Sequence, residues 1–255
     1  MEMKVSLATV VYNEANRIDA FLDAVASHVD EIVIVDQSST DGTIDAVSSW
    51  GERNLSLYGV ESLNVVLDKH WGFCERSRAL AHSRTSGDWV LVLDADERIS
   101  TNTAKFVRAL RSNHPSIGET LGVNLKRSLW VSGIHYWTGD YQFRLFNRAY
   151  VKYLDELHTE PQSTIKDPLK VYSPDWVGIW HEKSWVEQIR DENAYSKLIT
   201  SNDPRRDAKL ALNVYSRMLE DAGLTPEEAD KLAHDGADLA AWGIAPEHEP
   251  HEEIE

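Results

Sequence analysis

At its centre the chain reads Gly87-Asp88-Trp89-Val90-Leu91-Val92-Leu93-Asp94-Ala95-Asp96-Glu97, an apolar run that follows a turn signal and ends in carboxylates. A short apolar run rich in Val and Leu is typical of a strand buried on both faces inside a parallel sheet. Because side chains alternate along a strand, Asp94 and Asp96 point the same way if the extended conformation continues. Two carboxylates held close together repel each other unless a cation lies between them. The pair predicts either an acidic strand exit or a site for Mg²⁺ or Mn²⁺, which prefer oxygen ligands.

Strand and helix patterns alternate through the first hundred residues. Apolar runs of β type are followed by helical spacing of apolar residues, and residues 74–86 are also predicted to be helical. The runs cover Lys4–Tyr12, Glu31–Asp36 and Leu63–Leu67. Such alternation predicts an α/β fold with a mostly parallel sheet and helices on both of its faces.

Polar residues follow the predicted strands at the end where ligands of parallel sheets bind. Asn13 follows the first strand, Asp36 and Asp41 follow the second, and the aspartate pair follows the fourth. The carboxyl ends of parallel strands meet along one edge of the sheet. The sequence therefore predicts a nucleotide site at that edge.

The pattern changes after residue 100. A helix is predicted over 101–112, and strands are then predicted at Leu121–Leu125, Leu129–Ser132, Tyr141–Phe146 and Val151–Tyr153. Further helices are predicted over 182–200, 205–222 and 226–241.

Charge and composition narrow the classes of function. The net charge is −16, and residues 201–255 contribute −9 of it with 14 Asp or Glu against 5 Lys or Arg. This acidity argues against a broad nucleic-acid surface. A single cysteine, Cys74, excludes an intrachain disulfide and a cysteine-based zinc cluster. We expect a soluble, cytoplasmic chain without a transmembrane segment, because no long apolar run or secretory leader is present.

Three motifs in the right order resemble family 2 glycosyltransferases of the GT-A fold. They are Thr9-Val10-Val11-Tyr12-Asn13-Glu14, Asp36-Gln37-Ser38-Ser39-Thr40-Asp41-Gly42-Thr43, and the run from Gly87 to Glu97. Within that family the chain is most similar to bacterial lipopolysaccharide-core β-glucosyltransferases. The closer similarity lies in Trp71-Gly72-Phe73, Asp94–Arg98, Asp140–Phe146, His158-Thr159-Glu160 and His181.

The resemblance covers residues 3–200 and implies how the chain is organised. Residues 1–200 would form a Rossmann-like GT-A domain, with a nucleotide-sugar-binding half at 1–100 and an acceptor half at 101–200. Residues 201–255 would add a helical, acidic extension that closes over the acceptor site, forms a homo-oligomer or docks on another protein.

The activity that the resemblance implies is metal-dependent transfer of a hexose, with inversion at the anomeric carbon. The donor would be a UDP-sugar, with glucose as the expected hexose, and the acceptor a hydroxyl of a glycan, a glycolipid or another molecule. The cofactor would be Mn²⁺ or Mg²⁺, held by Asp94 and Asp96 with His181 completing its shell. The cation would neutralise charge that develops on the departing nucleoside diphosphate.

The same resemblance assigns the nucleotide contacts. Asp36 would accept hydrogen bonds from uracil, and Asp41 would hold the nucleotide or cap a helix. Arg76 and Arg78 would touch phosphate or remain solvated helix residues. The remaining predicted nucleotide contacts are Thr9, Tyr12, Asn13, Glu14, Asp94 and Ala95.

An inverting transfer also needs a base that removes the acceptor proton. Asp140 and Glu160 are the candidates, with Asp140 preferred because it directly precedes a predicted strand. Arg144 is expected to pair with a carboxylate, and His158 is a weaker metal or acceptor ligand.

Three alternatives stay open from the sequence. The acceptor could be a modified DNA base, although the acidic charge disfavours it. A nucleotidyltransferase would normally carry a Gly-rich loop after the first strand, where this chain has Tyr12-Asn13-Glu14-Ala15-Asn16. A non-catalytic glycan-binding module is disfavoured by the presence of both Asp94 and Asp96.

Overall fold

A computed structural model describes residues 3–111, 120–131, 134–153, 161–165, 169–173, 177–183 and 225. The chain divides into two compact units, residues 1–128 with 138–181 and residues 129–137 with 182–255. The polar residues at the carboxyl edge of the sheet belong to the first unit. Within the described residues, no helix is both long enough and apolar enough to cross a bilayer.

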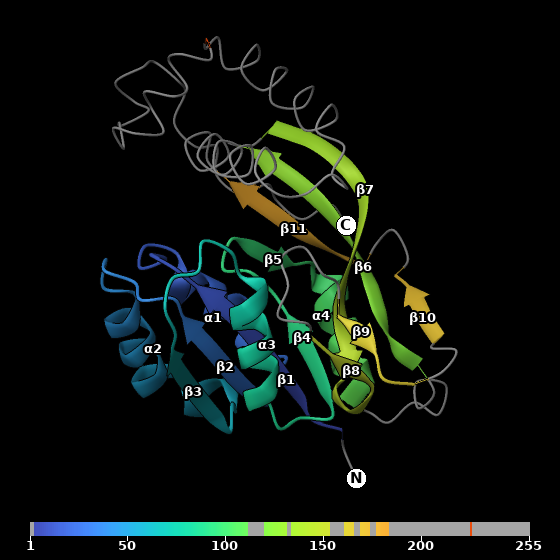
Figure 1. The fold of residues 1–255 in the computed structure, drawn as a ribbon, viewed down its shortest axis with the longest axis horizontal. Helices are drawn as coiled ribbons and strands as arrows, with labels where there is room; N and C mark the ends of the chain where they lie inside the picture. Colours follow the sequence, from blue (N-terminus) through green and yellow to red (C-terminus); the bar gives the residue numbers. More distant parts are fainter. Residues whose placement is uncertain are drawn as a thin grey trace. The chain divides into compact units, whose positions relative to one another are not determined.

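The amino-terminal half is a run of alternating strands and helices, as the sequence predicts. Its elements are β1 (Val5–Val11), α1 (Ile18–Ala26), β2 (Glu31–Asp36), α2 (Thr43–Tyr58), β3 (Ser62–Leu67), α3 (Glu75–Arg84) and β4 (Trp89–Val92). The strands lie in the order β3-β2-β1-β4, and each neighbouring pair is parallel (Figure 1). All four strands therefore end at the same edge of the sheet.

The second half extends this sheet with antiparallel neighbours. Its elements are β5 (Glu97–Ile99), α4 (Thr101–Arg111), β6 (Thr120–Val131), β7 (Ile134–Asn147), the 3₁₀ helix η2 (Arg148–Tyr150), β8 (Val151–Lys152), β9 (Gln162–Ser163), β10 (Leu169–Tyr172) and β11 (Gly178–Lys183). Strand β7 pairs with β4 and β11 pairs with β5, both antiparallel. Strand β10 pairs with β6 in parallel, and β8 and β9 form a separate two-stranded sheet.

Several predictions for this half need correction. The two strands predicted at 121–125 and 129–132 are one continuous strand, β6. Strands β5 and β11 were not predicted, because neither has a long apolar or alternating pattern. Residues 182 and 183, placed at the start of a predicted helix, belong to β11. The rest of that helix and those predicted over 205–222 and 226–241 lie outside the described residues.

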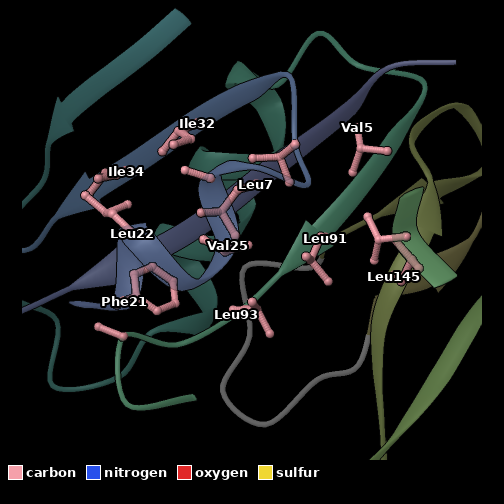
Figure 2. Close-up of a cluster of buried hydrophobic side chains, with 14 of the residues drawn as sticks. Val5, Leu7, Phe21, Leu22, Val25, Ile32, Ile34, Leu91, Leu93 and Leu145 are labelled. Atoms are coloured by element: carbon pink, nitrogen blue, oxygen red, sulfur yellow. The ribbon is translucent and has the colours of Figure 1, made fainter. Parts of the chain in front are cut away.

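The two faces of the sheet carry separate apolar clusters, because side chains alternate along each strand. Val5 and Leu7 of β1 face α1, and Figure 2 shows them with Phe21, Leu22 and other labelled side chains of α1, β2, β4 and β7. The alternate residue Ala8 belongs to the opposite cluster, which includes Ala81 of α3. Helices therefore cover both faces, as predicted. The structure is an α/β fold with a mostly parallel sheet.

Candidate active site

The loops that follow β1 and β2 are tied together by hydrogen bonds at the carboxyl edge. The Asn13 amide donates to Ser39 Oγ over 2.8 Å, and the Thr40 amide donates to Asn13 Oδ1 over 2.8 Å. Asn13 and Ser38 have positive φ angles of 58° and 63°. Non-glycine residues rarely adopt this conformation, and such strain is often found at functional sites.

Asp41 and Glu14 complete this cross-link. Asp41 Oδ2 accepts from the Ala15 amide at 3.0 Å, and Asp41 Oδ1 accepts from the Thr43 amide at the start of α2. The Glu14 amide donates to Thr43 Oγ1 over 2.8 Å. Partial burial opposes ionisation of Asp41, but hydrogen bonds from Thr43 and Ala15 outweigh it and lower the pKa of Asp41. The helix-capping interpretation of Asp41 thus has direct geometric support, and its contact with a nucleotide stays a prediction.

Asp36 ends β2 and is 1% exposed. Its Oδ1 accepts from the Ser39 amide at 2.9 Å, whereas its Oδ2 has no hydrogen-bond partner among the described residues. The buried Thr9 Oγ1 likewise has no such partner. A buried, unpaired carboxylate oxygen is costly in the free protein, so a ligand that donates a hydrogen bond there gains affinity.

Aromatic and basic side chains gather between β3 and α3. Tyr12 stacks on His70 with ring centroids 3.9 Å apart. Lys69 Nζ lies 3.5 Å and Arg76 Cζ lies 3.9 Å from the Trp71 ring centroid, distances typical of cation–π contacts. The structure therefore stacks two predicted nucleotide residues, Tyr12 and Arg76, on the aromatic rings of His70 and Trp71.

Asp68 holds Trp71 of this group in place and also contacts Ser77. Asp68 Oδ2 accepts from Trp71 Nε1 at 3.0 Å and from Ser77 Oγ at 2.8 Å, and Gln37 Nε2 in turn donates to Ser77 Oγ over 2.8 Å. Partial burial opposes ionisation of Asp68, but hydrogen bonds from Trp71 and Ser77 lower its pKa. Sequence reasoning missed Asp68, although an acid directly after a predicted strand was an available signal.

The chain leaves the extended conformation immediately after β4, which corrects one expectation. β4 ends at Val92, and Ala95 and Asp96 form a turn. The Asp94 carbonyl accepts from the Glu97 amide at 2.9 Å, which closes this turn. The Ala95 carbonyl accepts from Arg98 Nη1 at 2.8 Å. Asp94 and Asp96 therefore do not share one face of a strand, and each has its own partners.

Asp94 is held by two arginines. Arg78 Nη2 donates to both oxygens of Asp94 over 2.6 Å, and Arg144 Nη2 donates to Asp94 Oδ2 over 2.9 Å. Burial alone would raise the pKa of Asp94, but the Arg78 and Arg144 guanidiniums hold it well below its usual range. The contact between Arg78 and Asp94 was not predicted.

Glu97 connects to the same group from the interior. Arg144 Nη2 donates to Glu97 Oε1 over 2.7 Å, and the Asp94 amide donates to Glu97 Oε2 over 3.0 Å. Glu97 is fully buried and Arg144 nearly so. The expectation that Arg144 pairs with a carboxylate is confirmed, and it pairs with two.

Asp96 faces His181 instead. His181 Nε2 lies 2.9 Å from Asp96 Oδ2, and both side chains are partly buried. Pairing of β11 with β5 sets His181 opposite Glu97, the residue after Asp96. A carboxylate oxygen beside an imidazole nitrogen suits Mn²⁺, and an all-oxygen set would suit Mg²⁺ better.

A cation would find two ligands side by side but not a complete shell. Among the described residues, no three His, Cys, Asp or Glu side chains are grouped so that they could hold a metal ion. Asp94, the third predicted ligand, is engaged by Arg78 and Arg144. The Asp96–His181 pair fits a divalent ion whose remaining ligands come from water or phosphate, as is usual for Mg²⁺.

The predicted bases are not tested. Asp140 does not precede a strand as predicted, because its backbone lies within β7; its side chain is outside the described residues, as are His158 and Glu160.

The fold agrees with solved structures of the GT-A class. Staphylococcus aureus TarS residues 1–349 in complex with UDP-GlcNAc aligns with a TM-score of 0.52 and 17% identity, covering 85% of this chain and 72% of that one. The UDP complex of the same protein gives a TM-score of 0.51 with 17% identity, over 85% of this chain and 71% of that one. At this identity the likeness shows the fold, which is GT-A.

The family follows from the sequence match. Residues 6–164 match Glycosyl transferase family 2, so the chain belongs to that family. An uncharacterized glycosyltransferase of Rickettsia felis is 29% identical over 111 residues, which are 44% of this chain and 35% of the relative. An uncharacterized glycosyltransferase of Rickettsia prowazekii is 28% identical over 111 residues, 44% of this chain and 34% of the relative. The match thus spans about a third of the length of these curated relatives.

Proposed function

We propose that this chain transfers a hexose from a UDP-sugar to an acceptor hydroxyl with inversion, assisted by Mn²⁺ or Mg²⁺. The observation that carries the proposal is that Asp96 lies against His181 in a family 2 domain in which Asp36 Oδ2 is buried without a hydrogen-bond partner among the described residues. Glucose is the proposed hexose, by resemblance to lipopolysaccharide-core β-glucosyltransferases.

The donor's base would bind between the first two loops. Asp36 Oδ2 is an acceptor without a partner among the described residues, and the ring N–H of uracil is a matching donor. Tyr12 is partly exposed and already stacked on His70, so its ring is oriented for an aromatic base. The TarS structures contain UDP and UDP-GlcNAc, the class of donor proposed here.

The donor's diphosphate would lie toward the basic and acidic groups. Arg76 and Arg78, on the first two turns of α3, would supply positive charge to its oxygens. Asp96 and His181 would hold the cation, which supplies electrostatic stabilisation of the departing nucleoside diphosphate. Asp94 would contribute to the cation site, because it lies close to Asp96 in the chain.

The acceptor would be activated from the second half of the domain. We assign Asp140 as the base that removes the acceptor proton, with Glu160 as the second candidate. A glycan or glycolipid is the proposed acceptor. Residues 201–255 are proposed to be a separate helical extension that covers the acceptor or pairs two copies of the chain.

Labelled UDP-glucose, incubated with a glycolipid, an oligosaccharide or hydroxylated DNA, tests the proposal. We expect label in one of the first two acceptors, loss of transfer in EDTA and recovery on addition of Mn²⁺ or Mg²⁺. Asp96→Ala should be inactive without additions, in EDTA and after Mn²⁺ or Mg²⁺ is added back. Full turnover by Asp96→Ala in EDTA would refute the cation's role, and pyrophosphate release from a nucleoside triphosphate would favour a nucleotidyltransferase.

A further inference from the structure

Arg78 occupies the carboxylate that a cation would need. Its Nη2 donates to Asp94 Oδ1 and Oδ2, and Arg144 donates to Oδ2. A carboxylate offers about four lone-pair positions, so these three contacts use most of them. The negative charge of nearby Asp96 also acts on Asp94. A divalent cation that binds against both acids must therefore compete with an arginine for Asp94.

We propose that Arg78 is a displaceable countercharge, which neutralises Asp94 until a divalent cation binds beside Asp94 and Asp96 and which then turns to the diphosphate of the donor. This inference rests on the proposed function. It assigns Arg78 two alternating anionic partners, a carboxylate in the free protein and a phosphate in the complex.

The two arginines differ in a way that selects Arg78 as the mobile one. Arg144 is 6% exposed and is held by Asp94 together with Glu97, which is fully buried. Arg78 is 18% exposed, and Asp94 is the only carboxylate with which it forms an ion pair among the described residues. Its Nε is buried without a hydrogen-bond partner there. Arg78 can therefore leave Asp94 at the cost of one ion pair, whereas Arg144 would break two.

The geometry of α3 favours phosphate as the second partner. Arg76 lies two residues before Arg78, and both belong to the first two turns of this helix. The amino end of a helix carries partial positive charge, which adds to that of the two side chains. An anion that arrives beside Arg76 is thus drawn to the region that Arg78 can reach after it leaves Asp94.

The proposal predicts that Arg78→Gln raises the affinity for Mn²⁺ and reduces the effect of UDP on that affinity. Removing the charge of Arg78 frees Asp94 for the cation, so Mn²⁺ alone should bind Arg78→Gln about tenfold more tightly than wild type. The same substitution removes a proposed partner of the donor phosphate, so UDP should raise the affinity for Mn²⁺ by less than it does in wild type. Saturating UDP should tighten Mn²⁺ binding in both proteins, because the diphosphate supplies ligands to the cation, but the tightening should be about threefold smaller in Arg78→Gln than in wild type.

Isothermal titration of Mn²⁺ with and without UDP measures both quantities. Arg84→Gln is the matched control, because Arg84 is an exposed arginine at the end of the same helix. It should behave as wild type in both titrations. Arg78→Lys keeps the charge and should bind Mn²⁺ alone within about threefold of wild type.

A second measurement uses the unmodified protein and does not depend on the folding of a variant. Phenylglyoxal labels accessible arginines, and peptide mapping reports the labelling of Arg78. We expect Mn²⁺ to increase labelling of Arg78 and UDP with Mn²⁺ to reduce it, while Arg84 stays constant. Unchanged labelling of Arg78, or Mn²⁺ binding that is equal or weaker in Arg78→Gln, overturns the proposal.

The results also separate this inference from the proposed function. If wild type binds Mn²⁺ and UDP as described but transfers no sugar, the countercharge role stands and the transfer proposal fails. If wild type transfers sugar in EDTA and does not bind Mn²⁺, transfer stands and the countercharge role fails.

Discussion

His181 Nε2 lies 2.9 Å from Asp96 Oδ2 although 85 residues separate the two positions in the chain. The contact depends on the antiparallel register of β11 against β5, which sets His181 opposite Glu97. A slip of one residue would turn His181 to the other face of the sheet. His181 is therefore positioned by a strand, whereas Asp96 lies in the turn directly before β5.

Replacing either member of this pair should remove cation-dependent activity. We expect Asp96→Asn and His181→Ala each to lower kcat/KM by about 100-fold at fixed Mn²⁺, because each removes one ligand. Steady-state kinetics across a Mn²⁺ titration measures the effect. Asp88→Asn, at the opposite end of β4, is the control and should match wild type. Undiminished kcat/KM in both variants would contradict the metal assignment.

Asp36→Asn should weaken uridine nucleotide binding without harming the fold. Asparagine keeps an oxygen for the Ser39 amide but presents an NH₂ group where the base N–H would donate. The Kd of UDP should rise on the order of tenfold or more, since a hydrogen bond to a charged group contributes about 1.5–3 kcal/mol. Titration calorimetry with UDP, beside a thermal melt, checks both parts. Equal UDP affinity in a folded variant would rule out Asp36 as the base acceptor.

Asp41 should make stability depend on pH in the acid range. Its pKa is lowered by hydrogen bonds to the folded chain, so its contribution is present above the unfolded pKa of about 3.9 and is lost as pH falls through the folded value. Asp41→Asn should cost about 1 kcal/mol at pH 6, because the asparagine NH₂ group cannot accept from the Ala15 amide, and progressively less below pH 4. Urea unfolding at several pH values measures the difference. Asp45→Asn, an exposed acid in the first turn of α2, is the control and should show a smaller change.

The buried Arg144–Glu97 pair should be costly to break on one side only. Arg144→Met leaves Glu97 buried without its arginine partner, with an expected loss of about 3–5 kcal/mol in the free energy of unfolding. The double variant Arg144→Met/Glu97→Leu should lose less than this single variant, because no unpaired charge remains at Glu97. Urea unfolding of both proteins, with the exposed Lys152→Met as control, gives the comparison. A double variant that is less stable than Arg144→Met would contradict this expectation, because Glu97 would then stabilise the fold in the absence of Arg144.

The amino-terminal half was predictable because β1, β2 and β4 are buried on both faces and α1 repeats buried apolar residues at helical spacing. β2 has the bounds that the sequence indicates, Glu31–Asp36, and the predicted helix over 74–86 corresponds to α3. β5 and β11 were missed because their place in the sheet depends on pairing between distant segments, not on local pattern.

The predicted site residues could be named from the sequence more readily than the side chains that contact them. Asp36, Asp94, Asp96 and His181 all follow from motifs in the sequence. The different partners of Asp94 and Asp96 did not follow from the sequence. They depend on a turn that begins after Leu93 and on guanidiniums from α3 and β7. Sequence spacing gives no information about which arginine reaches which carboxylate.

The bonds between the first two loops have a consequence for how a nucleotide is recognised. Asn13 and Asp41 fasten these loops to each other in the ligand-free chain, so under the proposed function the loops would not need to be brought together when a nucleotide binds. Little conformational entropy is then lost on binding. Under the proposed function, loops held in place in this way would exclude a nucleobase of the wrong shape when it first makes contact, before any rearrangement of the chain.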